Sequence, residues 1–238
     1  MKAMILAAGL GTRLKPWTDK HPKALALVNG KSLLQRNIAY LQAHGIHEVI
    51  VNVHHFAEQI IDAIEANNGW GSKVTISDET DLVLETGGGL RKAFPYFEGE
   101  EHFALMNVDI LTDLNLTAMF SQHVASHALA TLAVTDRETS RYFLFNGRKE
   151  LCGWRNVKTG EEKIMREESP LFQKAFSGVH IIETSFFNLL KLKGKFSMVD
   201  AYLSLAPVRT IECFDHSGTK FIDVGKPESI DKAEGLFS

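Results

Sequence analysis

Short apolar runs alternate with amphipathic segments through the first half of the chain, and this alternation constrains the fold more than any other feature. The apolar runs have the length of β-strands and lie near residues 2–8, 48–53, 73–77, 103–108 and 128–135. Segments with helical spacing of apolar residues lie near 32–44, 56–66, 88–94 and 115–126. Because strands joined through helices pair in parallel and are covered on both faces, we expect a three-layer, Rossmann-like α/β fold with a mixed, mostly parallel sheet.

The pattern changes after residue 135. Several short β-like runs lie between 140 and 183, broken by the turn-forming pairs Asn146-Gly147 and Thr159-Gly160. The rest of the chain is expected to form helices near 184–192 and 197–205, a β pair across 208–222 and a closing helix from about 227. We therefore expect one domain over residues 1–238 with two parts, an α/β half over 1–135 and, over 136–238, a small β-rich lobe with the closing elements.

Charge and cysteine content exclude several classes of protein. The formal net charge is -3, and acidic and basic residues are interleaved without a basic stripe, so we expect no nucleic-acid partner. The two cysteines, Cys152 and Cys213, form no metal-binding pattern and indicate free thiols in a reducing compartment. The apolar run at the N-terminus is too short for a signal peptide, and no segment reaches membrane-spanning length. We expect a cytoplasmic protein without a membrane partner.

A glycine-rich loop follows the first apolar run and ends in an arginine. The segment reads Leu6-Ala7-Ala8-Gly9-Leu10-Gly11-Thr12-Arg13. In open α/β sheets, ligands bind at the carboxyl ends of the strands, where glycines let backbone N–H groups approach phosphate oxygens. The planar guanidinium of Arg13 is suited to clamp such oxygens. Taken alone, the loop is also compatible with a plain glycine turn whose arginine faces solvent.

Two other phosphate-binding patterns do not match this region. A dinucleotide-binding loop needs a third glycine where Leu14 stands, and Pro16 soon follows. A P-loop that ends in Gly30-Lys31-Ser32 needs a glycine where Leu25 stands. The glycine segment is therefore an extended loop of another kind.

Three further charged residues accompany the loop. Lys23 follows Pro22, and a lysine there can neutralise the charge of a phosphate under attack. Asp109 and Asp223 each follow an apolar run, and two carboxylates from separate strand ends can hold a hard cation such as Mg²⁺. Considered singly, a lysine such as Lys23 is more often a solvated surface cation, and each aspartate is equally a turn or helix cap.

Together these motifs resemble those of the sugar-phosphate nucleotidyltransferases. The similarity begins with the glycine loop and Pro22-Lys23, and it continues through Glu85-Thr86-Gly87-Gly88-Gly89, Asn107-Val108-Asp109 and Asp223-Val224-Gly225-Lys226-Pro227-Glu228. It spans nearly the whole chain and is weakest between 140 and 175. The branch that it resembles most contains N-acetylmuramate 1-phosphate uridylyltransferase and mannose 1-phosphate guanylyltransferase.

The resemblance implies a nucleotidyltransferase fold that binds the nucleotide in residues 1–135 and the sugar in the lobe. It also implies a Mg²⁺-dependent reaction of a nucleoside triphosphate with a sugar 1-phosphate, which releases pyrophosphate and a nucleotide sugar. In that reaction Asp109 and Asp223 bind the metal, Lys23 stabilises the charge at the α-phosphate, and Arg13 holds the departing pyrophosphate. The implied binding residues are Ala8, Gly9, Gly11, Thr12, Gly87 and Gly88 for the nucleotide, and Glu85 and Gly178 for the sugar.

Some of these assignments have alternatives, and the chain departs from the family at two positions. Without the resemblance, the glycines at 87–89 are equally a lead into the helix near residue 90, and Glu85 is equally a cap of that helix. Val108 stands where many relatives have glycine. Ser169 stands where several branches have a lysine that holds the sugar phosphate. The residues that could replace this lysine are Lys163, Arg166 and Lys174.

The substrate preference follows from the branch alone. UTP is the preferred nucleotide, and N-acetylmuramate 1-phosphate or another hexose 1-phosphate is the preferred acceptor. The alternative is a guanylyl- or cytidylyltransferase that acts on mannose 1-phosphate or phosphocholine. An alternative of another class is a catalytically silent nucleotide-sugar sensor, which is disfavoured because the loop arginine, the lysine and both aspartates are present.

Overall fold

The chain folds around one large sheet with helices on both faces. The computed structural model describes residues 1–237. The strands of the large sheet are β1 (Lys2–Leu6), β4 (Glu48–Val53), β5 (Lys73–Asp78), β6 (His102–Asn107), β8 (Ala130–Thr135), β9 (Arg141–Phe145), β10 (Leu151–Asn156), β11 (Glu161–Ile164), β12 (Phe172–Glu183) and β13 (Ile211–Asp215). Two small sheets pair β2 (Leu27–Val28) with β3 (Lys31–Ser32), and β7 (Ile110–Thr112) with β14 (Phe221–Asp223). The helices are α1 (Leu33–Ala43), α2 (Ala57–Ala66), α3 (Glu85–Lys92), α4 (Leu116–Ser126), α5 (Phe186–Leu189), α6 (Met198–Leu205) and α7 (Glu228–Leu236).

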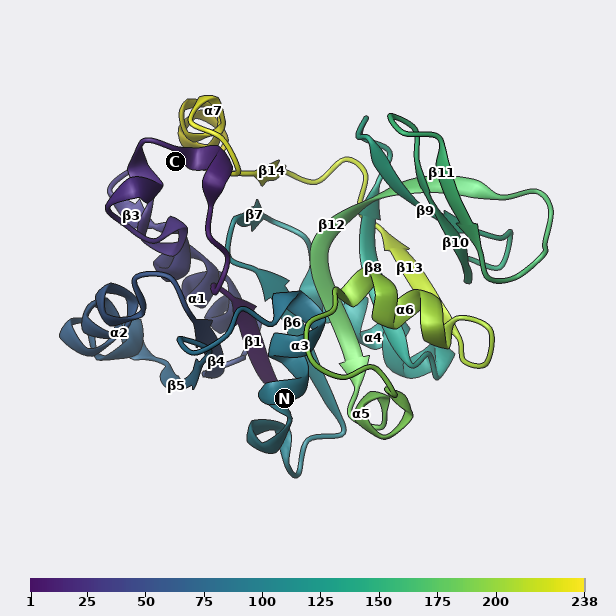
Figure 1. Ribbon diagram of the computed structural model, residues 1–238, viewed down its shortest axis with the longest axis horizontal. Helices are drawn as coiled ribbons and strands as arrows, with labels where there is room; N and C mark the ends of the chain where they lie inside the picture. Colours follow the sequence, from purple (N-terminus) through teal and green to yellow (C-terminus); the bar gives the residue numbers. More distant parts are fainter. Residues whose placement is uncertain (238) are drawn as a thin grey trace.

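The large sheet has a parallel centre and an antiparallel extension. Its strands follow the order β11-β10-β9-β12-β6-β1-β4-β5, with β8 paired to both β12 and β13 (Figure 1). Strand β1 is parallel to β4 and β6, and β4 is parallel to β5. Strand β12 runs antiparallel to β6, β8 and β9. The carboxyl ends of β1, β4 and β6 therefore meet at one edge, which is where ligands bind in open α/β sheets.

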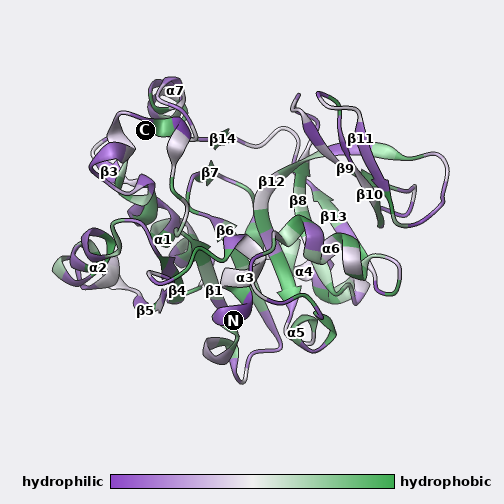
Figure 2. Ribbon diagram, viewed as in Figure 1, coloured by the Kyte–Doolittle hydropathy of each residue, from purple (hydrophilic) through white to green (hydrophobic). Residues whose placement is uncertain are grey.

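Alternating side chains of β1 pack into two separate cores, one on each face of the sheet. Ala3 and Ile5 belong to the core that contains apolar residues of α1 and α2, whereas Met4 and Leu6 belong to the core with residues of α3 and α6. A strand covered on both faces is apolar throughout, and this explains why residues 2–8 read as an unbroken apolar run. Figure 2 shows the hydrophobic colour gathered on the central strands, whereas β10 and β11 are largely hydrophilic. The expected three-layer α/β architecture is confirmed.

The two parts distinguished in the sequence are joined through the sheet. Strand β12 pairs at its start with β9 of the lobe and further along with β6 at the centre. Its register with β8 shifts between Phe176 and His180, around Gly178, whose φ is +73°. Helix α7, which lies late in the chain, packs against β2, which lies near the start of the chain. Within residues 1–237, every helix is too short or too polar to cross a membrane.

Three sequence-based expectations need correction. The strands across 208–222 do not pair with each other, because β13 joins β8 in the large sheet and β14 joins β7. The helix expected near 88–94 begins earlier, at Glu85, and takes in the three glycines. The helix expected near 184–192 is the short α5. Strand pairing over long sequence distances leaves no local signal, which explains the first error.

Candidate functional site

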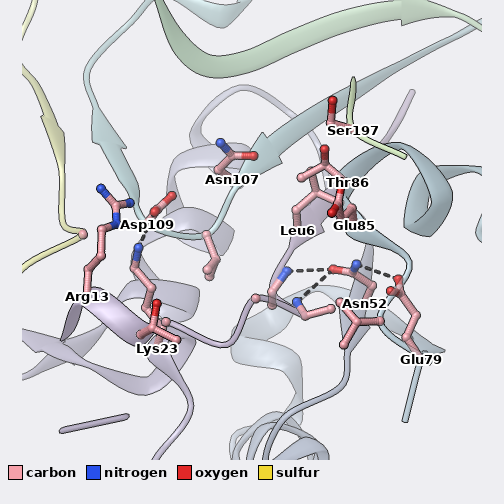
Figure 3. A pocket seen from close by; sticks show the side chains of 18 residues that line it. Leu6, Arg13, Lys23, Asn52, Glu79, Glu85, Thr86, Asn107, Asp109 and Ser197 are labelled. Carbon is pink, nitrogen blue, oxygen red and sulfur yellow. Dashed lines mark hydrogen bonds and ion pairs between the residues drawn. The ribbon is translucent and has the colours of Figure 1, made fainter. Parts of the chain in front are cut away.

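A cavity of about 460 Å³ lies where β1, β4 and β6 end. It is lined by residues from the glycine loop, from these strand ends and from the start of α3. The lining residues are Leu6, Ala7, Ala8, Gly9, Gly11, Thr12, Arg13, Lys23, Asn52, Glu79, Val83, Glu85, Thr86, Asn107, Val108, Asp109, Ser197 and Gly225. In Figure 3, Arg13, Lys23 and Asp109 lie on one side of the cavity, and Asn52, Glu79, Glu85 and Thr86 lie on the other. We call the first side the cationic end and the second side the Asn52 end.

The structure requires glycine at only one of the two glycine positions in the loop. Gly11 has a φ of +62°, and a Cβ on it would come within 2.8 Å of the Thr18 methyl group, so the turn itself requires glycine. Gly9 has no heavy atom within 4 Å of the position that its Cβ would occupy, so packing does not require glycine there. Both glycines, with Ala8 and Thr12, line the cavity. The backbone at Gly9 is therefore open to close approach by a ligand.

Lys23 is buried at the cationic end and pairs with Asp109. It begins the short 3₁₀ helix η3 (Lys23–Leu25), only 9% of the residue is exposed, and its Nζ donates to Asp109 Oδ2. A buried ammonium group is stable only where it is paired, so Asp109 explains its burial. The alternative of a solvated surface lysine is therefore wrong.

The small β7–β14 sheet brings the two aspartates together. Asp223 pairs in register with Ile110, and the Val224 N–H donates to the Asp109 carbonyl oxygen at 2.8 Å. Asp223 is not among the residues that line the cavity, but its Oδ2 lies 4.0 Å from Nη2 of Arg13, which does line it. Two residues 114 positions apart in the sequence are thus held side by side by backbone pairing.

The electrostatics at Asp223 suit a cation. Its Oδ1 is buried and has no hydrogen-bond partner among residues 1–237. Burial, and then the negative charge of Asp109, raise the pKa of Asp223. No group of three or more histidine, cysteine or acidic residues that could hold a metal occurs within the described chain. The donor set is two carboxylates, which fits Mg²⁺ because this ion usually keeps several waters and shares the oxygens of a phosphate substrate.

Asn52 and Glu79 form a buried pair that the sequence analysis did not identify. Asn52 Oδ1 accepts hydrogen bonds from the N–H groups of Ala7 at 2.7 Å and Ala8 at 3.4 Å, and its Nδ2 donates to Glu79 Oε1 at 2.7 Å (Figure 3). Only 1% of Glu79 is exposed, and burial raises its pKa. The pair fixes the start of the glycine loop to β4. Its only signal in the sequence is a single polar residue, Asn52, inside the apolar run 48–53.

Gly87 and Gly88, which were expected in a wall beside the nucleotide, are not among the residues that line the cavity. Both lie inside α3 and are buried. A Cβ on Gly87 would lie 2.4 Å from the Phe196 ring, and a Cβ on Gly88 would lie 2.4 Å from the Gly194 carbonyl oxygen. Close packing of α3 against this neighbouring segment therefore accounts for both glycines. Gly89 faces the buried pair instead, since its Cβ would lie 2.5 Å from Glu79 Oε1.

The two residues expected near the sugar occupy different positions. Glu85 lines the cavity, and its Oε1 lies 3.6 Å from Lys195 Nζ. It is the first residue of α3, whose N-terminus has no side-chain cap, so the capping alternative is wrong. Gly178 is not among the lining residues, but it lies next to one of them, because its Cβ would come within 2.9 Å of the Asn107 amide nitrogen.

Known proteins share the sequence pattern and the architecture of this chain. A profile of the family described as nucleotidyl transferase matches residues 2–234. The chain is 30% identical over 235 residues, 98% of this chain and 97% of the relative, to a D-glycero-alpha-D-manno-heptose 1-phosphate guanylyltransferase of Aneurinibacillus thermoaerophilus. It is 38% identical over 133 residues to an N-acetylmuramate alpha-1-phosphate uridylyltransferase of Neisseria meningitidis serogroup B, and this match spans 53% of the chain and little more than half, 57%, of the relative. The crystal structure of HddC from Yersinia pseudotuberculosis has a TM-score of 0.78 at 25% identity, with 100% of this chain and 99% of that chain covered.

Proposed function

Because the chain belongs to the nucleotidyl transferase family, we propose that it joins a nucleoside triphosphate to a sugar 1-phosphate and releases pyrophosphate. The observation that carries this proposal is the cationic end of the cavity. There the glycine loop, Arg13 and Lys23 face the paired carboxylates of Asp109 and Asp223. Such a set of backbone donors, cations and carboxylates suits a polyphosphate.

The two ends of the cavity suit the two ends of a nucleotide. The phosphates fit the cationic end, where the open backbone at Gly9 and the exposed guanidinium of Arg13 can donate to their oxygens. The nucleoside then extends toward the Asn52 end, between the loop and the start of α3. Asn52 holds the loop N–H groups of Ala7 and Ala8 in one arrangement before the substrate arrives.

Chemistry at the α-phosphate needs little acid-base help from the protein. The attacking oxygen of a sugar 1-phosphate is already anionic, and pyrophosphate is a good leaving group, so positioning and charge neutralisation suffice. Lys23 supplies a buried positive charge for the α-phosphate, and Arg13 supplies a planar donor for the departing pyrophosphate. In the absence of substrate, the charge of Lys23 is balanced by Asp109.

Asp109 and Asp223 are the residues that would hold Mg²⁺. When bound, this ion would neutralise part of the negative charge on the phosphate oxygens. The unpartnered Oδ1 of Asp223 and the pKa of its carboxyl, raised by burial and by Asp109, support the assignment.

UTP with N-acetylmuramate 1-phosphate, or another hexose 1-phosphate, is the preferred substrate pair. The 38% identity to the Neisseria uridylyltransferase supports it. A guanylyltransferase is the second candidate, because similarity to the Aneurinibacillus guanylyltransferase extends over 98% of the chain.

The test is pyrophosphate release with Mg²⁺ across UTP, dTTP, CTP and GTP, each with N-acetylmuramate, mannose, glucose and heptose 1-phosphates and with phosphocholine. We expect release from UTP with one of the sugar 1-phosphates. Release from GTP or CTP alone would transfer the proposal to the guanylyl or cytidylyl alternative. Folded protein that is silent with every pair would support the nucleotide-sugar sensor.

A further inference from the structure

A sugar 1-phosphate brings a second anion to the site, and the chain has Ser169 where relatives carry a lysine for it. The three cations that the sequence offers as replacements are all engaged elsewhere. Lys174 bridges Asp136 and Asp215, and Lys163 lies over the Trp154 ring at 5.7 Å. Arg166 donates to the carbonyl oxygens of residues 206 and 209. Cavity lining does not separate the candidates, because neither these three nor Arg137, the cation considered next, is among the residues that line the cavity.

Arg137 is a half-buried cation without a carboxylate partner within residues 1–237. Its Nη2 donates to the Phe176 carbonyl oxygen at 2.8 Å, and its guanidinium carbon lies 5.1 Å from the centroid of the Phe221 ring. Its Nε is buried and has no hydrogen-bond partner in the described chain. The side chain is thus held in place by a carbonyl and a ring while most of its hydrogen-bonding capacity is unused.

The two contacts of Arg137 lie on β12 and on β14, the strand that ends at Asp223. Phe221 stands two residues before Asp223 on β14, and Phe176 stands two residues before Gly178 on β12. Burial and Asp109 raise the pKa of Asp223, and the positive charges of Lys23, Arg13 and Arg137 oppose this shift. Arg137 is thus anchored to β12 through Phe176 and lies close enough to Asp223 to act on its charge, whereas Arg13 and Lys23 belong to the glycine-loop region.

We propose that Arg137 binds the phosphate group of the sugar 1-phosphate, in the role that a lysine at position 169 has in relatives. The inference rests on the proposed function. A guanidinium suits this task because its fixed fork donates to two oxygens of one phosphate, and because it stays charged when half-buried. Strand β12 then contributes to the site, because the carbonyl oxygen of its residue Phe176 accepts a hydrogen bond from Arg137 and holds the guanidinium in place.

The test compares Arg137→Gln and Arg137→Lys with Arg141→Gln, a matched control that removes an exposed arginine from the start of β9. Steady-state rates give separate KM values for the nucleotide and for the sugar 1-phosphate that the wild type accepts. We expect Arg137→Gln to raise the KM for the sugar 1-phosphate about tenfold or more, since a charge-assisted hydrogen bond contributes about 1.5–3 kcal/mol. The KM for the nucleotide should change less than about twofold, Arg137→Lys should recover part of the loss, and Arg141→Gln should match the wild type.

Two results would overturn the inference while leaving the proposed function standing. One is an active wild type with an unchanged sugar 1-phosphate KM in Arg137→Gln. The other is an equal rise in both KM values together with a lowered melting temperature, which indicates a purely structural role. A wild type that is silent with every substrate pair removes the proposed function and the inference with it.

Discussion

At the scale of single residues, Asp223 is a position where stability and function oppose each other. Its folded-state pKa lies above the ordinary value of 3.8, because burial and then Asp109 disfavour the ionised form. The native state therefore binds more protons than the unfolded state between 3.8 and the raised pKa, and stability falls as pH rises through this window. Above the window, the ionised carboxylate is a constant cost to the folded state.

Replacing Asp223 with asparagine should remove that cost. Without Mg²⁺, Asp223→Asn should melt at a higher temperature than the wild type at pH 7, and the difference should shrink toward pH 3. Added Mg²⁺ should raise the melting temperature of the wild type but not that of the variant, and turnover should fall about a hundredfold or more. Asp62→Asn, at an exposed position of α2, is the control. A variant that melts like the wild type at pH 7 and still responds to Mg²⁺ would refute the metal assignment.

Site residues that belong to a recognisable sequence motif could be predicted. Residues that hold those site residues in position could not. The glycine loop, Lys23 and Asp109 were singled out by residue type and position, and Glu85 was singled out through the family resemblance. Lys23, Asp109, Glu85 and most residues of the loop line the cavity. Asn52 and Glu79 were missed, because the pairing of β4 with β5 and the turn after it are needed to bring them together. The packing of Gly87 and Gly88 against residues 194–196 could not be predicted, because a glycine indicates a close approach but does not identify the neighbour.

At the scale of elements, β4 fixes the glycine loop through one side chain. Asn52→Ala would leave the N–H groups of Ala7 and Ala8 without their acceptor, so the loop should lose its fixed arrangement. We expect the KM for the nucleotide to rise about tenfold, corresponding to the roughly 1–3 kcal/mol cost of an unsatisfied buried donor. Asn67→Ala, at the exposed end of α2, should leave the KM unchanged. An unchanged nucleotide KM in Asn52→Ala would show that the loop keeps its conformation without the hydrogen bonds to Asn52.

Helix α3 depends on its glycines for packing. In Gly88→Ala the added methyl group would meet the Gly194 carbonyl oxygen at 2.4 Å, so the helix must move away from its neighbour. Overpacking of this kind costs about 1–3 kcal/mol, and the melting temperature should fall accordingly. Gly235→Ala in α7 is the matched control, because nothing lies within 4 Å of its Cβ position, and it should be neutral or slightly stabilising. Equal melting temperatures for the two variants would contradict the packing role.

At the scale of the whole molecule, local sequence patterns predicted the central strands and helices but not the pairing of strands that are distant in the sequence. Up to residue 135, the strands of the large sheet and the α-helices were predicted within a few residues, because each has a periodic or continuous apolar pattern, whereas the short strands β2, β3 and β7 were not predicted. The pairing of β13 with β8 and of β14 with β7 was not predicted, because it joins segments about 80 to 110 residues apart. Yet β7 and β14 bring Asp109 and Asp223 together, so the site depends on a contact that only the folded chain reveals.

The reverse reaction tests the central claim most directly. Folded protein is incubated with radiolabelled pyrophosphate, Mg²⁺ and one nucleotide sugar at a time, and label in the nucleoside triphosphate is measured. The account predicts labelled triphosphate from a matching nucleotide sugar, dependent on Mg²⁺ and on an intact Lys23. Absence of label with every uridine, guanosine, cytidine and thymidine nucleotide sugar tested, from protein that melts cooperatively, would contradict it.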